Sequence, residues 1–116
     1  PGECSRLAEI AGPHPRLPPL PVGEFAAVAA QVFAVVGNDS GLAHLAQAAR
    51  RAEGLEASTL HVIFGSTEPA KTGPPGCTAH ATAKQPCAPC YKKACLLGHD
   101  EPPCLDVPVE AILGAL

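Results

Sequence analysis

The chain has 116 residues, of which 47% are hydrophobic, 16% charged and 3% aromatic, and its formal net charge is −3. This length gives one small domain with a modest core, and the composition excludes a highly charged disordered tail. The basic pairs Arg50-Arg51 and Lys92-Lys93 do not make a nucleic-acid-binding stripe, and no apolar run approaches the roughly twenty residues that span a bilayer.

The start of the chain predicts a piece of a longer protein, because it begins with Pro1 and contains no Met. Residues 1–21 are rich in Pro and Gly, and we expect an extended lead-in, the remnant of a truncated domain, with the end of a helix at residues 5–10. Residues 22–116 are expected to form the domain itself. The N-terminus does not resemble a signal peptide, so the cysteines are expected to be reduced, as in the cytoplasm.

The first half of the domain predicts helix, strand and helix. Residues 22–31 have apolar positions at helical spacing, and residues 32–36 are a short apolar run typical of a strand covered on both faces. Residues 41–51 predict a second helix with one apolar face, made of Leu42, Leu45, Ala46 and Ala49. Arg50 and Arg51 lie in its last turn, where cations suit the helix dipole.

The second half predicts a strand at residues 59–64, a Gly- and Pro-rich loop at 71–76 and a weak strand within 78–84. Residues 86–104 form a Cys-rich loop that is expected to be irregular. Residues 108–116 begin with Pro and predict a C-terminal helix docked on the sheet. This order of elements predicts an α/β fold with parallel strands, whose ligands bind beyond the carboxyl ends of the strands.

Two small polar turns follow the two main strands and are expected at that same edge. The first runs from Gly37 to Gly41 and opens directly into a helix, whose first N–H groups lack partners and suit an anion. The second is Gly65-Ser66-Thr67. Both turns also have structural explanations: Asp39 and Ser40 as helix caps, worth about 1 kcal/mol, and hydroxyl groups that satisfy a turn.

Three segments together resemble the C-terminal half of family 9 glycosyltransferases, which include the ADP-heptose:lipopolysaccharide heptosyltransferases. They are Asn38-Asp39-Ser40-Gly41-Leu42-Ala43-His44, Phe64-Gly65-Ser66-Thr67-Glu68-Pro69, and Cys87-Ala88-Pro89-Cys90-Tyr91-Lys92-Lys93 with Cys95 and Cys104. The resemblance implies part of a GT-B fold, with a partial Rossmann-like parallel sheet and flanking helices, that binds a nucleotide-sugar donor.

The resemblance also implies an inverting transfer of heptose, or a related sugar, from ADP-heptose to the lipopolysaccharide core. The acceptor and the general base would belong to a missing N-terminal domain, so no catalytic residue is expected here and the fragment alone would be inactive. Catalysis would need no cofactor, in keeping with the lack of an Asp-x-Asp pair. The enzyme would work at the cytoplasmic face of the inner membrane, with peripheral membrane association and no nucleic-acid partner.

We expect residues of both turns to bind the nucleotide-sugar donor. Asp39 would bind sugar or ribose hydroxyls, since a carboxylate repels a diphosphate, and His44 would donate to phosphate or bond a neighbouring carbonyl. The remaining candidates are the N–H groups and small side chains that would cradle the donor: Ser40, Gly41, Leu42, Gly65, Ser66 and Thr67. Lys71 could pair with phosphate or be solvated, and His61, inside an apolar strand, is expected to be structural.

The cysteines of the loop form a C-x2-C-x4-C-x8-C pattern: Cys87, Cys90, Cys95 and Cys104. Four thiolates would bind a structural zinc ion or an iron–sulfur cluster, and free thiols or a labile disulfide are the alternatives. Cys4 and Cys77 are expected to be small apolar residues. The sequence therefore also allows a second function: a cysteine–metal interaction module without nucleotide binding.

Overall fold

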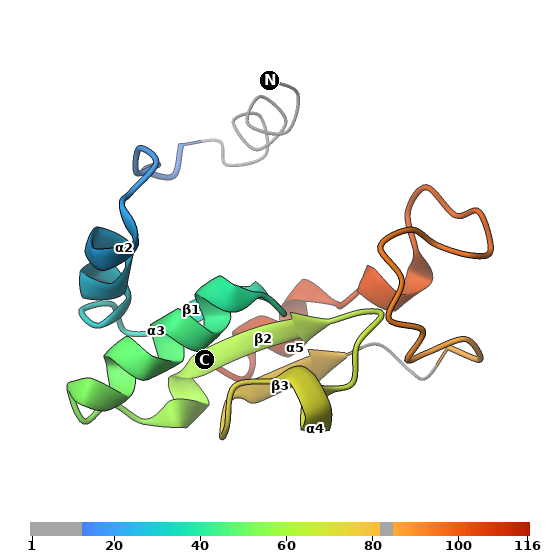
Figure 1. Cartoon of the computed structure of the whole chain (residues 1–116). Coiled ribbons are helices and arrows are strands. Elements are labelled where there is room, and N and C mark those ends of the chain that lie inside the picture. Colours follow the sequence, from blue (N-terminus) through green and yellow to red (C-terminus); the bar gives the residue numbers. More distant parts are fainter. Residues whose placement is uncertain (1–12, 82–84) are drawn as a thin grey trace.

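A three-stranded parallel sheet is the centre of the protein, whose computed structural model describes residues 13–81 and 85–116 (Figure 1). The strands are β1 (Val35–Asn38), β2 (Leu60–Phe64) and β3 (Thr78–Ala81), in the order β1-β2-β3. This is the α/β architecture with parallel strands that the sequence predicts. The helix expected at residues 5–10, Cys4, and residues 82–84 at the end of the weak strand lie outside the described residues.

Two helices pack against each other on one side of the sheet: α2 (Val22–Ala29) and α3 (Gly41–Ala52). A short helix, α4 (Pro69–Thr72), follows β2, and another, α5 (Val109–Leu113), ends the fold behind the sheet in the view of Figure 1. Single 3-10 turns lie at Ala57–Thr59 and Pro103–Leu105. Among the described residues, no helix is long and apolar enough to cross a membrane.

The core lies between α3 and one face of β2. Alternate residues of the strand, Leu60, Val62 and Phe64, are fully or almost fully buried, as the two-residue repeat of a strand requires. They meet small side chains of the two helices, Ala29, Ala43 and Ala46. Because alanine is short, α3 can lie close to the sheet, which fixes the position of its N-terminus relative to the ends of the strands.

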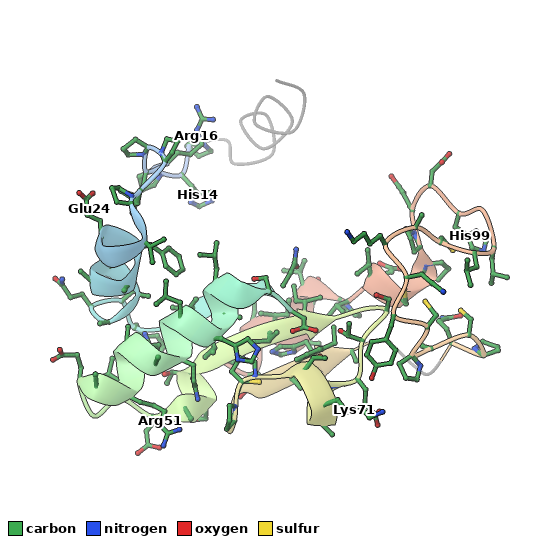
Figure 2. All side chains as sticks on the ribbon, viewed as in Figure 1. His14, Arg16, Glu24, Arg51, Lys71 and His99 are labelled. Atoms are coloured by element: carbon green, nitrogen blue, oxygen red, sulfur yellow. The ribbon has the colours of Figure 1, made fainter. Side chains whose placement is uncertain are left out.

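The buried face of α3 includes Ala46, as predicted, but is otherwise rotated about the helix axis from the predicted face, since Leu45 and Ala49 are half-buried. The buried positions are Ala43, Ala46, Gln47 and Arg50, whereas Leu42 is 53% exposed. Arg50 is 1% exposed and donates through Nη1 to the carbonyls of Ala29 and Val32, each at 2.8 Å. Its Nη2 donates to the carbonyl of Phe33 at 2.8 Å and to the Thr59 hydroxyl at 2.6 Å. Arg50 thus joins α3 to two other segments, residues 29–33 and Thr59, whereas its neighbour Arg51 extends into solvent (Figure 2).

The first strand also differs from its prediction in position and in burial. It starts at Val35, three residues later than expected, because the carbonyls of Val32 and Phe33 serve Arg50 rather than a sheet. Its residues alternate between half-buried and exposed, and Val36 is 47% exposed. The expectation of a strand covered on both faces is therefore wrong for β1, whereas β2 has four of its five residues buried.

The opposite face of the sheet carries a buried pair of histidines. His61 Nδ1 and His80 Nε2 are 2.9 Å apart, and the rings stack at a centroid distance of 5.2 Å. His61 is 1% exposed and His80 is 7% exposed. Burial lowers the pKa of His61, and a positive charge on His80 would lower it further. The structural role predicted for His61 is confirmed, and its partner comes from the next strand.

The C-terminal third has little regular structure. Residues 86–104 are irregular, as predicted, apart from the start of the turn at Pro103–Leu105. The final helix is shorter than expected and has no buried residue. Its apolar side chains Val109 and Leu113 are 61% and 62% exposed. The helix predicted at residues 108–116 is therefore present only at Val109–Leu113, and none of its residues is buried as a docked helix requires.

Candidate functional site

The two polar turns lie at the carboxyl edge of the sheet, as predicted. Asn38 of β1 pairs with Ile63 of β2, and the chain continues this pairing by one residue, since the Asp39 N–H donates to the Ile63 carbonyl at 3.1 Å. Asp39 is therefore fixed where β1 ends, next to the point where β2 runs into Gly65. Two turns that are 26 residues apart in sequence start from neighbouring strand ends.

The first turn of α3 follows Asp39 directly. Ser40 is the N-cap in an extended conformation, and its carbonyl accepts from the N–H groups of Ala43 at 3.1 Å and His44 at 3.5 Å. The N–H groups of Gly41 and Leu42 precede the first intrahelical acceptor and are available to an anion. A Cβ placed on Gly41 would meet no atom within 4 Å, so the space in front of this turn is open.

Asp39 does not cap α3, although the sequence allowed a helix cap as the structural explanation for this residue. Ser40 holds the cap position, and neither side chain makes a cap hydrogen bond. Asp39 Oδ2 instead accepts from the Thr72 hydroxyl at 2.7 Å. The partly buried carboxylate is thus bonded to the end of α4, a segment that the sequence analysis assigned to a loop.

His44 turns toward that same segment. Its Nε2 atom lies 2.9 Å from the carbonyl oxygen of Thr72, and its side chain is exposed. One turn further along α3, Gln47 Nε2 donates to the carbonyl of Pro75 at 2.6 Å. Three side chains of α3 and its preceding turn therefore contact the chain after β2, and they hold the two halves of the site together.

The second turn lines a cavity of about 570 Å³ beyond the ends of β2 and β3. Two of its predicted donor-binding residues, Gly65 and Thr67, contribute to the wall, together with Phe64, Ala81, Gln85 and Pro89.

Ser66 faces a different, smaller cavity, and its carbonyl accepts from the Tyr91 N–H at 2.8 Å. Lys71 Nζ lies 5.9 Å from the centroid of the Tyr91 ring, a cation–π contact. The structure therefore brings Asp39 and His44 together with Thr72, and ties the second turn to the Cys-rich loop.

The four cysteines of the loop line that smaller cavity, which has a volume of about 170 Å³. Cys87, Cys90, Cys95 and Cys104 surround it together with Ser66, Lys92 and Lys93. All four are free thiols. Within residues 13–81 and 85–116, no three His, Cys, Asp or Glu side chains are already close enough to hold a metal ion.

Cys77 behaves as the small apolar residue that the sequence predicts. It packs against the core, and burial raises the pKa of its thiol, with the negative charge of Asp39 adding to the rise. A thiol with a raised pKa is mostly protonated at neutral pH, so Cys77 is a poor nucleophile and a poor metal ligand.

Sequence reasoning missed Thr72, which makes more contacts with the candidate site than any residue of the second turn. Its partners lie 33 and 28 residues away in the sequence. The local signal was weak, because α4 has only four residues, Pro69–Thr72, and ends before Gly73. Pro69 at the first helical position is the sequence feature that could have indicated a helical turn here, which the structure closes with the Thr72 N–H donating to the Glu68 carbonyl at 3.0 Å.

Comparison with known proteins bears on the same residues. The family model for glycosyltransferase family 9 (heptosyltransferase) matches residues 13–100. The chain is 42% identical over 80 residues to lipopolysaccharide heptosyltransferase 1 of Pseudomonas aeruginosa, a stretch that makes up 68% of this chain and 21% of that protein. No solved structure matches the chain closely enough to be counted as similar.

The family match spans both polar turns, α3, α4 and most of the Cys-rich loop. It includes Asp39, His44 and Thr72, and it extends over the partial Rossmann-like sheet that positions them. The chain spans about a fifth of the length of the curated relative. On the strength of this match, the chain belongs to glycosyltransferase family 9.

Proposed function

We propose that this chain carries the nucleotide-sugar donor site of a glycosyltransferase, located where α3 begins. The observation that carries the proposal is the cluster of Asp39, Thr72 and His44 beside the open first turn of α3. A hydrogen-bonded carboxylate suits sugar or ribose hydroxyls, and free backbone N–H groups suit a diphosphate. Both kinds of group occur within six consecutive residues, from Asp39 to His44.

The two parts of the donor would occupy different sides of this cluster. The diphosphate would lie against the N–H groups of Ser40, Gly41 and Leu42, where the positive end of the helix dipole favours negative charge. Asp39 would face the ribose or the sugar, because a carboxylate beside a phosphate is repelled. Gly65, Ser66 and Thr67 would form the far wall, since Gly65 and Thr67 line the adjacent cavity.

The transfer itself would be a direct displacement with inversion at the anomeric carbon. The bond from that carbon to the nucleoside diphosphate breaks as the acceptor oxygen bonds to it, and the acceptor proton passes to a base outside this chain. The first turn of α3 stabilises the charge that develops on the leaving diphosphate. The chain alone would be inactive, because the acceptor site and the base would belong to the other half of a GT-B enzyme.

The proposed donor sugar and acceptor are based on the name of the matched relative and not on the geometry of the site. The matched Pseudomonas protein is named a lipopolysaccharide heptosyltransferase, which favours ADP-heptose as the donor and a lipopolysaccharide core sugar as the acceptor. Such an enzyme would work at the cytoplasmic face of the inner membrane with peripheral attachment, and it would need no cofactor for transfer.

Titration calorimetry of the chain with ADP tests the donor site directly. We expect saturable binding that Gly41→Val weakens by at least about tenfold, because the new side chain fills the space of the diphosphate. Gly23→Val is the matched control: Gly23 also lies in the first turn of a helix, α2, and a Cβ there also meets no atom within 4 Å. Binding by the Gly41→Val chain equal to that of the Gly23→Val chain would contradict the proposal.

The Cys-rich loop supports a second proposal, a structural zinc ion held by Cys87, Cys90, Cys95 and Cys104. All four thiols border one cavity of about 170 Å³, and a soft set of sulfur donors fits Zn²⁺. Metal binding would draw the thiolates inward and stiffen a loop that has almost no regular structure. This role is compatible with donor binding; as a separate function it would make the chain an interaction module.

Cobalt titration of the reduced chain tests the metal proposal, because Co²⁺ in a thiolate site has a strong sulfur-to-metal absorption band. We expect one equivalent to produce this band and zinc to displace it. Replacing Cys90 with Ser should abolish the band, whereas Cys77→Ser, outside the cavity, should leave it unchanged. No band in the folded, reduced chain, or equal bands in both variants, would exclude the four-cysteine site.

A further inference from the structure

One residue of α4 contacts both chemically distinctive side chains of the candidate site. Thr72 uses its hydroxyl for Asp39 and its carbonyl for His44. We infer that Thr72 is the positioning residue of the donor site, which sets the orientation of Asp39 and the ring tautomer of His44. This inference rests on the proposed donor-binding function and adds a residue, and a protonation pattern, that neither the motifs nor the comparisons assign.

The hydroxyl of Thr72 fixes the Asp39 carboxylate. The Thr72 Oγ1 atom lies 2.7 Å from Asp39 Oδ2 and 3.2 Å from the Glu68 carbonyl, so its single hydrogen is directed mainly at the closer carboxylate. The backbone of Asp39 is held separately by Ile63 at 3.1 Å. With its backbone bonded to β2 and Oδ2 bonded to α4, Asp39 keeps Oδ1 for a hydroxyl group of the donor.

The carbonyl of Thr72 selects the tautomer of His44. A carbonyl oxygen only accepts hydrogen bonds, so the Nε2 atom at 2.9 Å must carry the hydrogen. In the neutral ring, Nδ1 is then an acceptor. His44 Nδ1 can therefore accept a hydrogen bond from a hydroxyl group of the nucleotide-sugar. The same atom can donate to phosphate only when the ring is an imidazolium ion. This limits the phosphate contact that the sequence predicts for His44.

Thr72 is itself held firmly enough to act in this way. It is the last residue of α4, and the next residue, Gly73, is the C-cap of this helix, whose N–H donates to the Pro69 carbonyl. A Cβ on Gly73 would come within 2.6 Å of the Pro69 carbonyl oxygen and 3.0 Å of Phe64 Cζ. Because Phe64 is 1% exposed, the end of α4 lies beside a buried residue of the sheet. The position of Thr72 is thus tied to the core rather than to a loose loop.

Three variants of the chain test the hydroxyl in ADP titrations. Thr72→Val keeps the shape of the side chain but removes the hydroxyl group that donates to Asp39, and we expect about tenfold weaker ADP binding. Thr72→Ser keeps the hydroxyl and should bind within about twofold of the unaltered chain. Thr78→Val is the matched control, because the Thr78 hydroxyl donates to the Ser58 carbonyl at 2.8 Å at the opposite end of the sheet.

The tautomer of His44 is measured without any ligand, by long-range ¹H–¹⁵N correlation of the unaltered chain. The inference predicts a hydrogen on Nε2. A neutral His44 ring with its hydrogen on Nδ1 and none on Nε2 would overturn the positioning of His44, and equal ADP affinity in the Thr72→Val and Thr78→Val chains would overturn that of Asp39. Failure of the unaltered, folded chain to bind ADP contradicts the donor site instead, and the tautomer result distinguishes that outcome from an error in the role of Thr72.

Discussion

At the scale of single residues, the polar groups that matter are bonded across long stretches of sequence. Asp39 and His44 both meet Thr72, and His61 meets His80. The motif around Asp39 indicated where a ligand would bind, because a strand, a tight turn and a helix start are readable from neighbouring residues. It could not indicate that Thr72 would hold the carboxylate, because no local pattern links residues 33 positions apart.

The buried histidine pair makes the stability of the fold depend on pH. The pKa of His61 is lowered by burial and by His80, so below about pH 6.5 the unfolded chain binds a proton that the folded chain does not. Stability is therefore fully present above that pH. It falls as the pH drops toward the folded pKa, with a slope of up to about 1.4 kcal/mol per pH unit.

Urea unfolding between pH 5 and 8 measures this effect. The double variant His61→Leu/His80→Leu lacks the ring of His61 and that of its partner, so its stability should change less over this range than that of the unaltered chain. His99→Ala is the control, since His99 is exposed in the Cys-rich loop (Figure 2). Identical pH profiles for the double variant and the unaltered chain would show that the pKa of His61 is not lowered as its burial requires.

At the scale of elements, α3 and β2 were predictable and their neighbours less so. The bounds of α3 differ from the prediction by one residue at its C-terminus, and those of β2 by one residue at its start, because both have a strong apolar period. The buried face of α3 was misjudged because Arg50, placed in the exposed last turn, is buried with four hydrogen bonds. An arginine whose partners are backbone carbonyls leaves no complementary charge in the sequence.

The same arginine explains the misplaced start of β1. Val32 and Phe33 have the composition of a strand, yet their carbonyls bond to Arg50 and leave the sheet. Helix α4 was missed for a different reason: its four residues, Pro69–Thr72, give no periodic signal, and the Gly73 that follows lies close to Phe64, a contact that no local pattern predicts. Local sequence patterns therefore predict the elements with large apolar faces, and they fail where a long-range contact determines the bounds of an element.

At the scale of the whole molecule, the two polar turns and the Cys-rich loop surround one edge of a small parallel sheet. Hydrogen bonds from Asp39 and His44 join the Asp39 turn and α3 to Thr72 of α4, and the Tyr91 N–H donates to the Ser66 carbonyl, which ties the Cys-rich loop to the second turn. Among residues 13–81 and 85–116, the core that supports this edge contains six buried apolar residues. Such a thin core makes the contacts of Arg50 and Thr72 important for keeping the site in one arrangement.

The most direct measurement is to locate ADP on the chain by ¹H–¹⁵N NMR at increasing ADP concentration. The account predicts that the amide signals of Ser40, Gly41 and Leu42 shift most, with smaller shifts at Gly65 and Thr67, because the diphosphate lies against the first turn of α3. If the chain is folded and those signals stay in place while signals of the Cys-rich loop shift, or if no signal shifts, the donor site is not at this turn.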